Sequence, residues 1–351
     1  MSDHTIINEL LKLTKPFVGR ADLIQGPGGN TSVKDEAGNM YIKASGFRFN
    51  EMNDNGGYSA VSSGVIEKYF RNVQIISKEQ CEKESLELIT NNILSDANGV
   101  KFPKPSMETG FHAVLDKYVI HTHSVWANLV NCNELGTELR NKVQEKLAVP
   151  IVHIPFVSPG FGLSYLITQE LIYAEKNNSP KPKIFFLENH GIIAHGDNME
   201  EVTNLLTEVD SSIAKIFSVE IDAYPVTQVE LKEESFFPVN DYCSRILSKY
   251  KVAADFFDQV LFPDQTVFFK GNITLTGEES KKINISADYT LKYKGNEREA
   301  ESIHETMTAY LFLYDTLRTA ANKIKLIKGK EIDYINNMDM EKHRKNIMKN
   351  S

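Results

Sequence analysis

The stretch VIHTHSVWANLV at residues 119–130 contains the most informative short pattern in this chain. With Tyr118 it forms an apolar run that ends in histidines, and such a run predicts a buried strand. Residues two apart in a strand point to the same face, so His121 and His123 should lie side by side at the strand end. Two neighbouring imidazoles supply two ligands for a metal ion. The pair alone is equally typical of two unrelated histidines at a strand edge.

A third histidine is needed if this pair belongs to a catalytic zinc site, which also keeps one position open for water or substrate. The candidates are His112, His153, His190 and His195. His190 ends another apolar run and precedes Gly191, whose missing side chain leaves room for a ligand to approach. The pattern therefore favours His190, whereas His195 is typical of a turn and His153 of a core residue or of a residue that supports a ligand.

An acidic residue stands at the start of a predicted short helix in PSMETGFHAVL, residues 105–115. Pro105 and Ser106 are typical of a helix start, with Ser106 as the N-cap. Glu108 would then complement the helix dipole from the first turn. Beside a metal that polarises a carbonyl, the same carboxylate could instead carry a proton. His112 lies four residues later on the same helix face and is a candidate to brace Glu108.

Two short loops could hold an anion. The segment GGNTS at residues 28–32 can cradle a phosphate with backbone N–H groups, although the same letters are also ordinary turn chemistry. The segment KASG at residues 43–46 ends a predicted strand and adds a hydroxyl and an N–H. Neither loop has the spacing of a Rossmann or Walker phosphate loop.

Strands and helices alternate along the first 220 residues, which favours a layered α/β or α/β/α domain. After about residue 220 Lys and Glu become denser, so we predict domains at 1–220 and 221–351. A polar, Gly-rich connection is expected at residues 50–64. Strands are expected at 31–34, 40–44, 118–123, 149–156 and 183–190, and helices at 6–20, 85–94, 108–115, 198–217 and 300–325.

Composition narrows the functional class. The chain has 351 residues, of which 41% are hydrophobic, enough for a sizeable core. A net charge of −8 argues against nucleic-acid binding, which needs clustered Lys and Arg. The three widely spaced cysteines predict no disulfide framework and a reducing compartment. No secretory signal and no membrane-length run of about 18 apolar residues is found, so we expect a cytoplasmic protein with no membrane partner.

In their order along the chain, these segments resemble the class II aldolase/adducin family. The likeness rests on residues 28–34, 43–46, 105–115, 119–130 and 186–196, supported by VPIVHIPFVSPGFG at 149–162. The resemblance implies an α/β/α sandwich around a mostly antiparallel central sheet, followed here by a C-terminal α/β extension of unknown role. It also implies a homo-oligomer, with a tetramer expected.

The resemblance also implies roles for individual residues. His121, His123 and His190 match the family's zinc ligands, so Zn²⁺ or another divalent metal is the expected cofactor. Glu108 matches the acidic residue that moves a proton beside the metal. Met107 replaces a serine of the fuculose-phosphate aldolase branch, which places this chain outside that branch. The expected phosphate-binding residues are Gly29, Asn30, Ser45, Gly46 and Ser106.

The function implied is a zinc-dependent lyase that acts on a phosphorylated ketose or sugar acid through a metal-stabilised enediolate. Retro-aldol cleavage is favoured, and the alternatives are a decarboxylase, an epimerase or a dehydratase with the same metal site. From another class, the family's adducin branch offers a non-catalytic scaffold. In aldolases the second acid is often a Tyr of a neighbouring subunit. Tyr165 and Tyr173 lie in the right general region, although both are also typical packing residues.

Within the family, the chain looks most similar to the aldolase portion of rhamnulose-phosphate aldolase/dehydrogenase proteins. The C-terminal segments QVLFPDQTVFFKG at 259–271 and NNMDMEKHRK at 336–345 are similar to the tail of that group. The dehydrogenase half is missing, because no strand–GxGxxG–helix unit follows residue 220.

Overall fold

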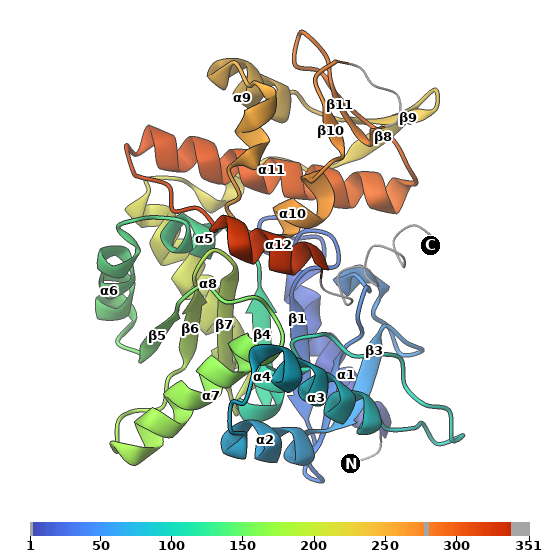
Figure 1. Ribbon diagram of the computed structural model, residues 1–351, viewed down its shortest axis with the longest axis vertical. Helices are drawn as coiled ribbons and strands as arrows, with labels where there is room; N and C mark the ends of the chain where they lie inside the picture. The colour runs from blue at the N-terminus through green and yellow to red at the C-terminus, as the bar shows by residue number, and fades with distance from the viewer. Residues whose placement is uncertain (1–2, 277–280, 338–351) are drawn as a thin grey trace.

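A seven-stranded sheet forms the centre of the larger part of the molecule (Figure 1). The computed structural model describes residues 3–276 and 281–337. Neighbouring strands of this sheet run antiparallel, except for the parallel pair β5 and β6. The order is β3-β2-β1-β4-β7-β6-β5. The strands are β1 Asn30–Lys34, β2 Asn39–Lys43, β3 Tyr58–Ser62, β4 Tyr118–Thr122, β5 Ile151–Ile154, β6 Ile184–Leu187 and β7 Gly191–Gly196.

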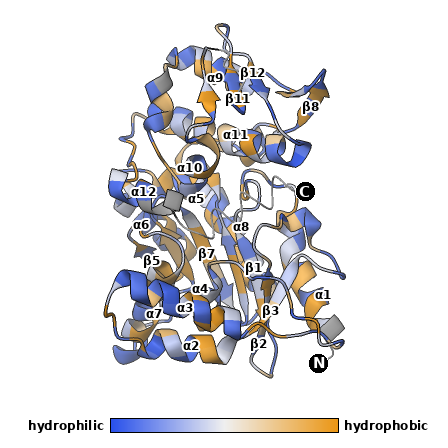
Figure 2. Cartoon of the chain, turned by 45° about the vertical axis from the view of Figure 1, so that its right-hand side comes forward, coloured by the Kyte–Doolittle hydropathy of each residue, from blue (hydrophilic) through white to orange (hydrophobic). Residues whose placement is uncertain are grey.

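Both faces of this sheet are covered by helices, which confirms the expected sandwich. Alternate strand residues point to opposite faces. Tyr41 and Ile120 join the apolar cluster with α1 and α8, whereas Ile42 and Val119 join the cluster with α2 and α7. Hydrophobic residues gather along the central strands (Figure 2). The helices of this part are α1 Asp3–Thr14, α2 Ser63–Asn72, α3 Lys78–Asn91, α4 Thr109–Val114, α5 Val125–Asn131, α6 Gly136–Leu147, α7 Phe161–Lys176 and α8 Met199–Ile216.

The predicted connection at residues 50–64 is wrong in its second half. Strand β3 forms there and pairs with β2, with Val61 opposite Met40, and α2 begins directly after it. Gly57 belongs to the turn before the strand, at φ +84°, where an added Cβ would lie 2.8 Å from the Cα of Met52. The alternating pattern was hidden because the strand is short and Ser59 is fully buried within it.

The C-terminal region forms a smaller α/β unit above the large sheet (Figure 1). Its five strands follow the order β10-β11-β12-β9-β8. They are β8 Val229–Lys232, β9 Ser235–Pro238, β10 Ile273–Thr274, β11 Ile283–Ile285 and β12 Leu291–Tyr293. The helices are α9 Tyr242–Tyr250, α10 Pro263–Phe269, α11 Glu297–Thr319 and α12 Gly329–Asn337. Short 3₁₀ turns are η1 Lys15–Phe17, η2 Phe49–Glu51, η3 Ile221–Ala223 and η4 Ala254–Asp258.

One apolar cluster runs from the large sheet into the C-terminal region. Trp126 of α5 meets Phe312 of α11 edge to face, with ring centroids 5.3 Å apart, and both belong to the cluster that also contains α8. Burial of such large rings stabilises the contact strongly. Helices α10 and α12 lie between the two sheets (Figure 1). The C-terminal region therefore packs against the large sheet at the end where strand β4 finishes.

Two further expectations concern the limits of the chain. The likeness noted at 336–345 falls mainly on residues 338–345, which lie outside the described residues. Within residues 3–276 and 281–337, no helix combines the length and apolar character that crossing a membrane requires.

Candidate metal centre and substrate pocket

Three buried histidines meet at the end of the large sheet. His121 is in β4, His123 follows that strand, and His190 lies in the turn between β6 and β7. Their ring centroids are 4.9–5.1 Å apart, and one nitrogen of each ring lies within 4.8 Å of the others. Within the described part of the chain, Nε2 of His121 is buried without a hydrogen-bond partner. Such a nitrogen is expensive to bury, and a metal ion would satisfy it.

In His121 and His123, the ring nitrogen Nδ1 is bound by another group of the protein. Nδ1 of His121 lies 3.0 Å from the carbonyl oxygen of Ile192, and Nδ1 of His123 hydrogen-bonds the carboxylate of Asp264. A ring that donates from Nδ1 keeps the lone pair of Nε2 for a metal. Burial lowers the pKa of His121, and it lowers the pKa of His190 to about 3. The rings of His121 and His190 are therefore neutral near pH 7, which is the form that binds metal.

Glu108 faces this histidine cluster. Its Oε2 lies 3.5 Å from Nε2 of His121 and its Oε1 lies 3.5 Å from Nε2 of His190. Burial acts to raise the pKa of Glu108, but the histidines and a hydrogen bond from Asn30 outweigh it and lower the pKa to about 2. The carboxylate is therefore ionised. Among the described residues, Oε1 has no hydrogen-bond partner, so this atom is open to a proton.

The helix expected at 108–115 forms at Thr109–Val114, but the expected N-cap, Ser106, is wrong by two residues. Helix α4 begins at Thr109, and Glu108 is its N-cap without a side-chain capping bond. The hydroxyl of Ser106 instead accepts from the backbone N–H of Glu108 at 3.3 Å. Because the carboxylate turns toward the histidines and not toward the helix, the capping role does not explain this residue.

His112 braces Glu108 as expected, but through Asn30. The ring of His112 contacts the hydroxyl of Ser32 at 2.7 Å with Nδ1 and the amide oxygen of Asn30 with Nε2. The amide nitrogen of Asn30 then donates to Oε2 of Glu108 at 2.7 Å and to the hydroxyl of Ser106 at 3.1 Å. Asn30 thus fixes one oxygen of the carboxylate and leaves the other free to react.

One pocket brings most of the predicted residues together. Lys43, which the sequence reasoning overlooked, is buried in its wall and donates to the carbonyls of Pro27 at 2.9 Å and Phe47 at 2.8 Å. This ammonium ties the loop that begins at Pro27 to the loop that includes Phe47. His121 lies just behind the lining. The pocket is lined by Pro27, Gly28, Gly29, Asn30, Lys43, Ser45, Gly46, Ser106, Met107, Glu108, His123, Pro159, His190, Pro263 and Asp264.

Pro263 and Asp264 lie in the segment 259–271 noted above for its resemblance, but the sequence assigned them no role in the site, because a Pro and an Asp are also ordinary helix-start residues. The expectation for Gly191 needs correction as well. A Cβ there would lie 2.2 Å from the carbonyl oxygen of Thr122, so the glycine permits close packing of β7 on β4 and does not make room for a ligand. Gly28, however, does leave room for a candidate ligand, because an added Cβ there would lie 2.7 Å from Nδ1 of His123.

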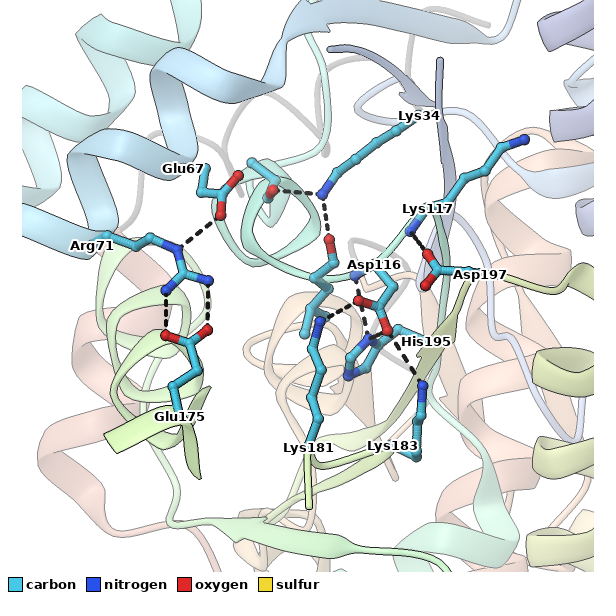
Figure 3. Close-up of polar contacts among 12 residues, drawn as sticks. Lys34, Glu67, Arg71, Asp116, Lys117, Glu175, Lys181, Lys183, His195 and Asp197 are labelled. Carbon is cyan, nitrogen blue, oxygen red and sulfur yellow. Dashed lines mark hydrogen bonds and ion pairs between the residues drawn. The ribbon is translucent and has the colours of Figure 1, made fainter. Parts of the chain in front are cut away.

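The remaining histidines have other partners. His195 is a buried residue of β7 and not a turn residue, and its Nδ1 lies 2.9 Å from the carboxylate of Asp116 (Figure 3). Lys181 and Lys183 bind the same carboxylate. His153 is partly exposed in β5, 3.3 Å from Oε2 of Glu188. Neither histidine joins the three-histidine cluster found among the described residues.

The two tyrosines lie elsewhere. Tyr165 stacks on Phe161 in α7, with ring centroids 5.8 Å apart, which is a packing role. Tyr173 is 64% exposed. Within the described residues neither one lines the pocket. Tyr173 is accessible to a second chain, whereas Tyr165 is held by its neighbour ring.

Comparisons with known proteins agree with this geometry. Residues 8–216 match the class II aldolase and adducin N-terminal domain. The chain is similar to the 3-oxo-tetronate 4-phosphate decarboxylases of Escherichia coli O6:H1 (strain CFT073) and of strain K12, 26% and 25% identical over 139 residues. These matches cover 36% of this chain and 62% of each relative.

A solved structure with a similar fold is the N-terminal class II aldolase domain of a conserved protein from Thermoplasma acidophilum. It is 22% identical, covers 60% of this chain and 92% of its own, and superimposes with a TM-score of 0.47. The family match extends over more than half of the chain and includes the three histidines and Glu108. The chain belongs to the class II aldolase and adducin family.

Proposed function

We propose that this protein is a divalent-metal-dependent lyase that cleaves a carbon–carbon bond in a phosphorylated ketose or sugar acid, with retro-aldol cleavage favoured. The observation that carries the proposal is the buried cluster of His121, His123 and His190 directly beside the ionised carboxylate of Glu108. A scaffold protein has no use for three buried, converging imidazoles whose burial costs stability.

The residues present fit a metal ion. His121, His123 and His190 would hold it, and Zn²⁺ is the preferred ion because three imidazoles with an open fourth position are a common catalytic zinc set. When bound, the metal supplies Lewis-acid stabilisation of the negative charge that develops on the substrate oxygens.

Glu108 is proposed to carry the proton at Oε1. Asn30 holds Oε2 at 2.7 Å, which keeps the carboxylate plane fixed while Oε1 faces the cluster. An ionised carboxylate in this position accepts the proton of the substrate hydroxyl as the carbon–carbon bond breaks. The same oxygen then returns the proton to the carbanion carbon, as aldol cleavage requires.

The anionic end of the substrate is proposed to lie between the two loops. Gly29, Ser45, Gly46 and Ser106 line this part of the pocket and offer backbone N–H groups and hydroxyls. The Lys43 ammonium between the loops adds a positive charge. In a chain whose net charge is −8, local cations of this kind are needed to attract an anion.

Metal analysis and a substrate screen test the proposal together. Purified protein should contain about one zinc ion per chain. Incubation with phosphorylated ketoses should release an aldehyde and dihydroxyacetone phosphate, and the release should stop when a chelator removes the metal. Purified protein that contains no metal after growth with added zinc would favour the scaffold alternative and contradict the proposal.

Decarboxylation is the second candidate, because the curated relatives are named 3-oxo-tetronate 4-phosphate decarboxylases. Loss of CO₂ from a 3-oxo acid also leaves an electron pair beside a carbonyl, so the same metal ligands and the same carboxylate would serve. Released CO₂ distinguishes this reaction from aldol cleavage, which releases an aldehyde. An epimerase or a dehydratase would release neither, since the carbon skeleton stays intact.

We also propose a cytoplasmic homo-oligomer, with a tetramer expected from the family and a small sugar phosphate or sugar acid as the ligand. Cys81, Cys132 and Cys243 are all unpaired and buried, which suits a reducing compartment. Sedimentation at micromolar concentration tests the assembly, and a monomer would refute it. In the oligomer, a Tyr of the neighbouring subunit would supply the second acid, and the exposed Tyr173 is a candidate for it.

A further inference from the structure

We infer that Asp264, at the start of α10, is a positioning residue for the metal ligand His123, so that the C-terminal region forms part of the metal site. This inference rests on the metal site proposed above. Asp264 lies outside the matched family domain, which ends at residue 216. It gives a role to a region whose sequence offered none.

The contact itself joins two buried side chains that are far apart in the sequence. The carboxylate of Asp264 is hydrogen-bonded to Nδ1 of His123, and the two residues are 1% and 5% exposed. An ionised carboxylate only accepts hydrogen bonds, so Nδ1 carries the proton. With Nδ1 held by Asp264, Nε2 is the nitrogen of His123 that remains for the metal. A carboxylate behind a ligating imidazole fixes its orientation and raises its basicity.

The carboxylate is mounted on a rigid element. Helix α10 is buried along its whole length and begins with Pro263, whose ring fixes the backbone for the first turn. Gln265 accepts from the backbone N–H of Leu261 at 2.9 Å and donates to the carbonyls of Phe257 and Gln259 at 3.2 and 2.9 Å. These bonds lock the chain on both sides of Asp264. A carboxylate held this firmly can set the angle of the His123 ring.

The same part of the chain also holds the turn that carries His190. Asn189, at φ +52°, donates its side-chain amide to the carbonyls of Leu261 and Lys325, each at 2.8 Å. The ammonium of Lys325 binds Glu188 at 2.7 Å. The residue before His190 is thus tied to a carbonyl three residues before Asp264. Two of the three candidate ligands are supported by the C-terminal region.

The anion end of the pocket receives a third support from α11. Arg298 donates to the carbonyl of Gly46 and to Glu51, both at 2.7 Å. Glu305 accepts from the backbone N–H of Gly26 at 2.6 Å and from the guanidinium of Arg48. Both loops of the pocket are therefore bonded to one helix. This distribution agrees with a region that shapes the site and does not merely cover it.

A purely structural role for Asp264 makes a different forecast. If the buried carboxylate of Asp264 only supports the fold, its loss would lower the melting temperature of the metal-free protein and leave the metal affinity of the folded fraction unchanged. A positioning residue changes the metal affinity and the geometry at the metal. These two readouts can be measured separately.

The experiment uses the full chain with Asp264→Ala, Asp264→Asn and the control Asp315→Asn. Asp315 is another acceptor of the C-terminal region, but it binds Lys249 and Tyr250, away from the pocket. Zinc affinity is measured by competition with a chromophoric chelator, and the visible spectrum of the Co²⁺-substituted protein reports ligand geometry. We expect Asp264→Ala to weaken zinc binding about 10–100-fold and to change the Co²⁺ spectrum. Asp264→Asn should give a smaller effect, and Asp315→Asn none.

The outcomes separate this inference from the proposed function. Wild-type protein that binds zinc, together with Asp264 variants of unchanged affinity and spectrum, would overturn the positioning role alone. Wild-type protein that binds no zinc would overturn both. If Asp264→Ala does not fold, Asp264→Asn decides the matter, because it keeps the shape of the side chain and removes the charge.

Discussion

The N-terminal and C-terminal regions contribute to one pocket in different ways. Residues 3–220 contain the three histidines and Glu108, and they present them from strand ends and turns with recognisable spacing. The C-terminal region contributes Asp264, Arg298 and Glu305 from helices whose local sequence is ordinary. Reactive groups in this chain are thus encoded in short segments, whereas their orientation depends on partners that lie 71 to 141 residues away in the sequence.

The strongest test of this contrast removes a group that only the N-terminal region supplies. His121→Ala should abolish stoichiometric zinc binding and activity together, because two remaining imidazoles do not make a catalytic zinc site. Metal content by atomic emission and turnover on the screened substrate check this. His195→Ala is the matched control, since that ring is bound to Asp116 and should leave the metal content intact. Normal zinc content in His121→Ala would refute the ligand assignment.

Glu108→Gln separates the chemistry of the N-terminal region from metal binding. The amide keeps the shape of the side chain but cannot accept the proton, so kcat should fall about 10²–10⁴-fold. Zinc content should stay near that of the wild type, since the three histidines remain. Turnover within a few-fold of the wild type would show that Glu108 serves only as the N-cap residue of α4. The proton carrier would then have to be sought among tyrosines at a subunit interface.

A third test concerns a buried acid that belongs wholly to the N-terminal region. Asp210 in α8 accepts from the hydroxyl of Ser124 at 2.7 Å, and burial raises its pKa to about 7. The folded protein therefore keeps a proton that the unfolded chain loses near pH 4. The free energy of unfolding should fall as the pH rises from about 4 to about 7, and this group should contribute no further change above that.

Asp210→Asn should remove this pH dependence, because the amide does not titrate and still accepts from Ser124. Above pH 7 the variant should be more stable than the wild type by about 2 kcal/mol. Urea denaturation at pH 5 and pH 8 measures the difference. Parallel pH profiles for the two proteins would show that Asp210 titrates normally and that its burial is relieved in solution.

The smallest expected effect tests the C-terminal region. Arg298→Ala removes the donor to Gly46 and Glu51 and should loosen the anion end of the pocket. We expect KM for a phosphorylated substrate to rise about tenfold, equivalent to about 1.4 kcal/mol, with unchanged zinc content. Arg245→Ala is the control, because the side chain of Arg245 on α9 is exposed. An unchanged KM in Arg298→Ala would mean that the N-terminal loops hold their shape without α11.

Much of the large sheet could be predicted because its signals are local. The strands expected at 31–34 and 40–44 and the helix expected at 198–217 form at nearly those positions. Errors arose where the local signal was short or ambiguous. The pattern predicts a connection where β3 forms, and it predicts Ser106 as the N-cap of α4 because a serine before an apolar run is the usual cap.

By itself, the sequence determined which side chains could hold a metal. The two-residue period of a strand places His121 and His123 on one side whatever the rest of the fold does. Only the tertiary structure decided which residues support the side chains of the site. Asn30 on Glu108 and Asp264 on His123 depend on the packing of segments that are 78 and 141 residues apart. Backbone geometry fixes the first kind of relation within a few residues, whereas the second follows from how whole helices and strands pack, which no local spacing records.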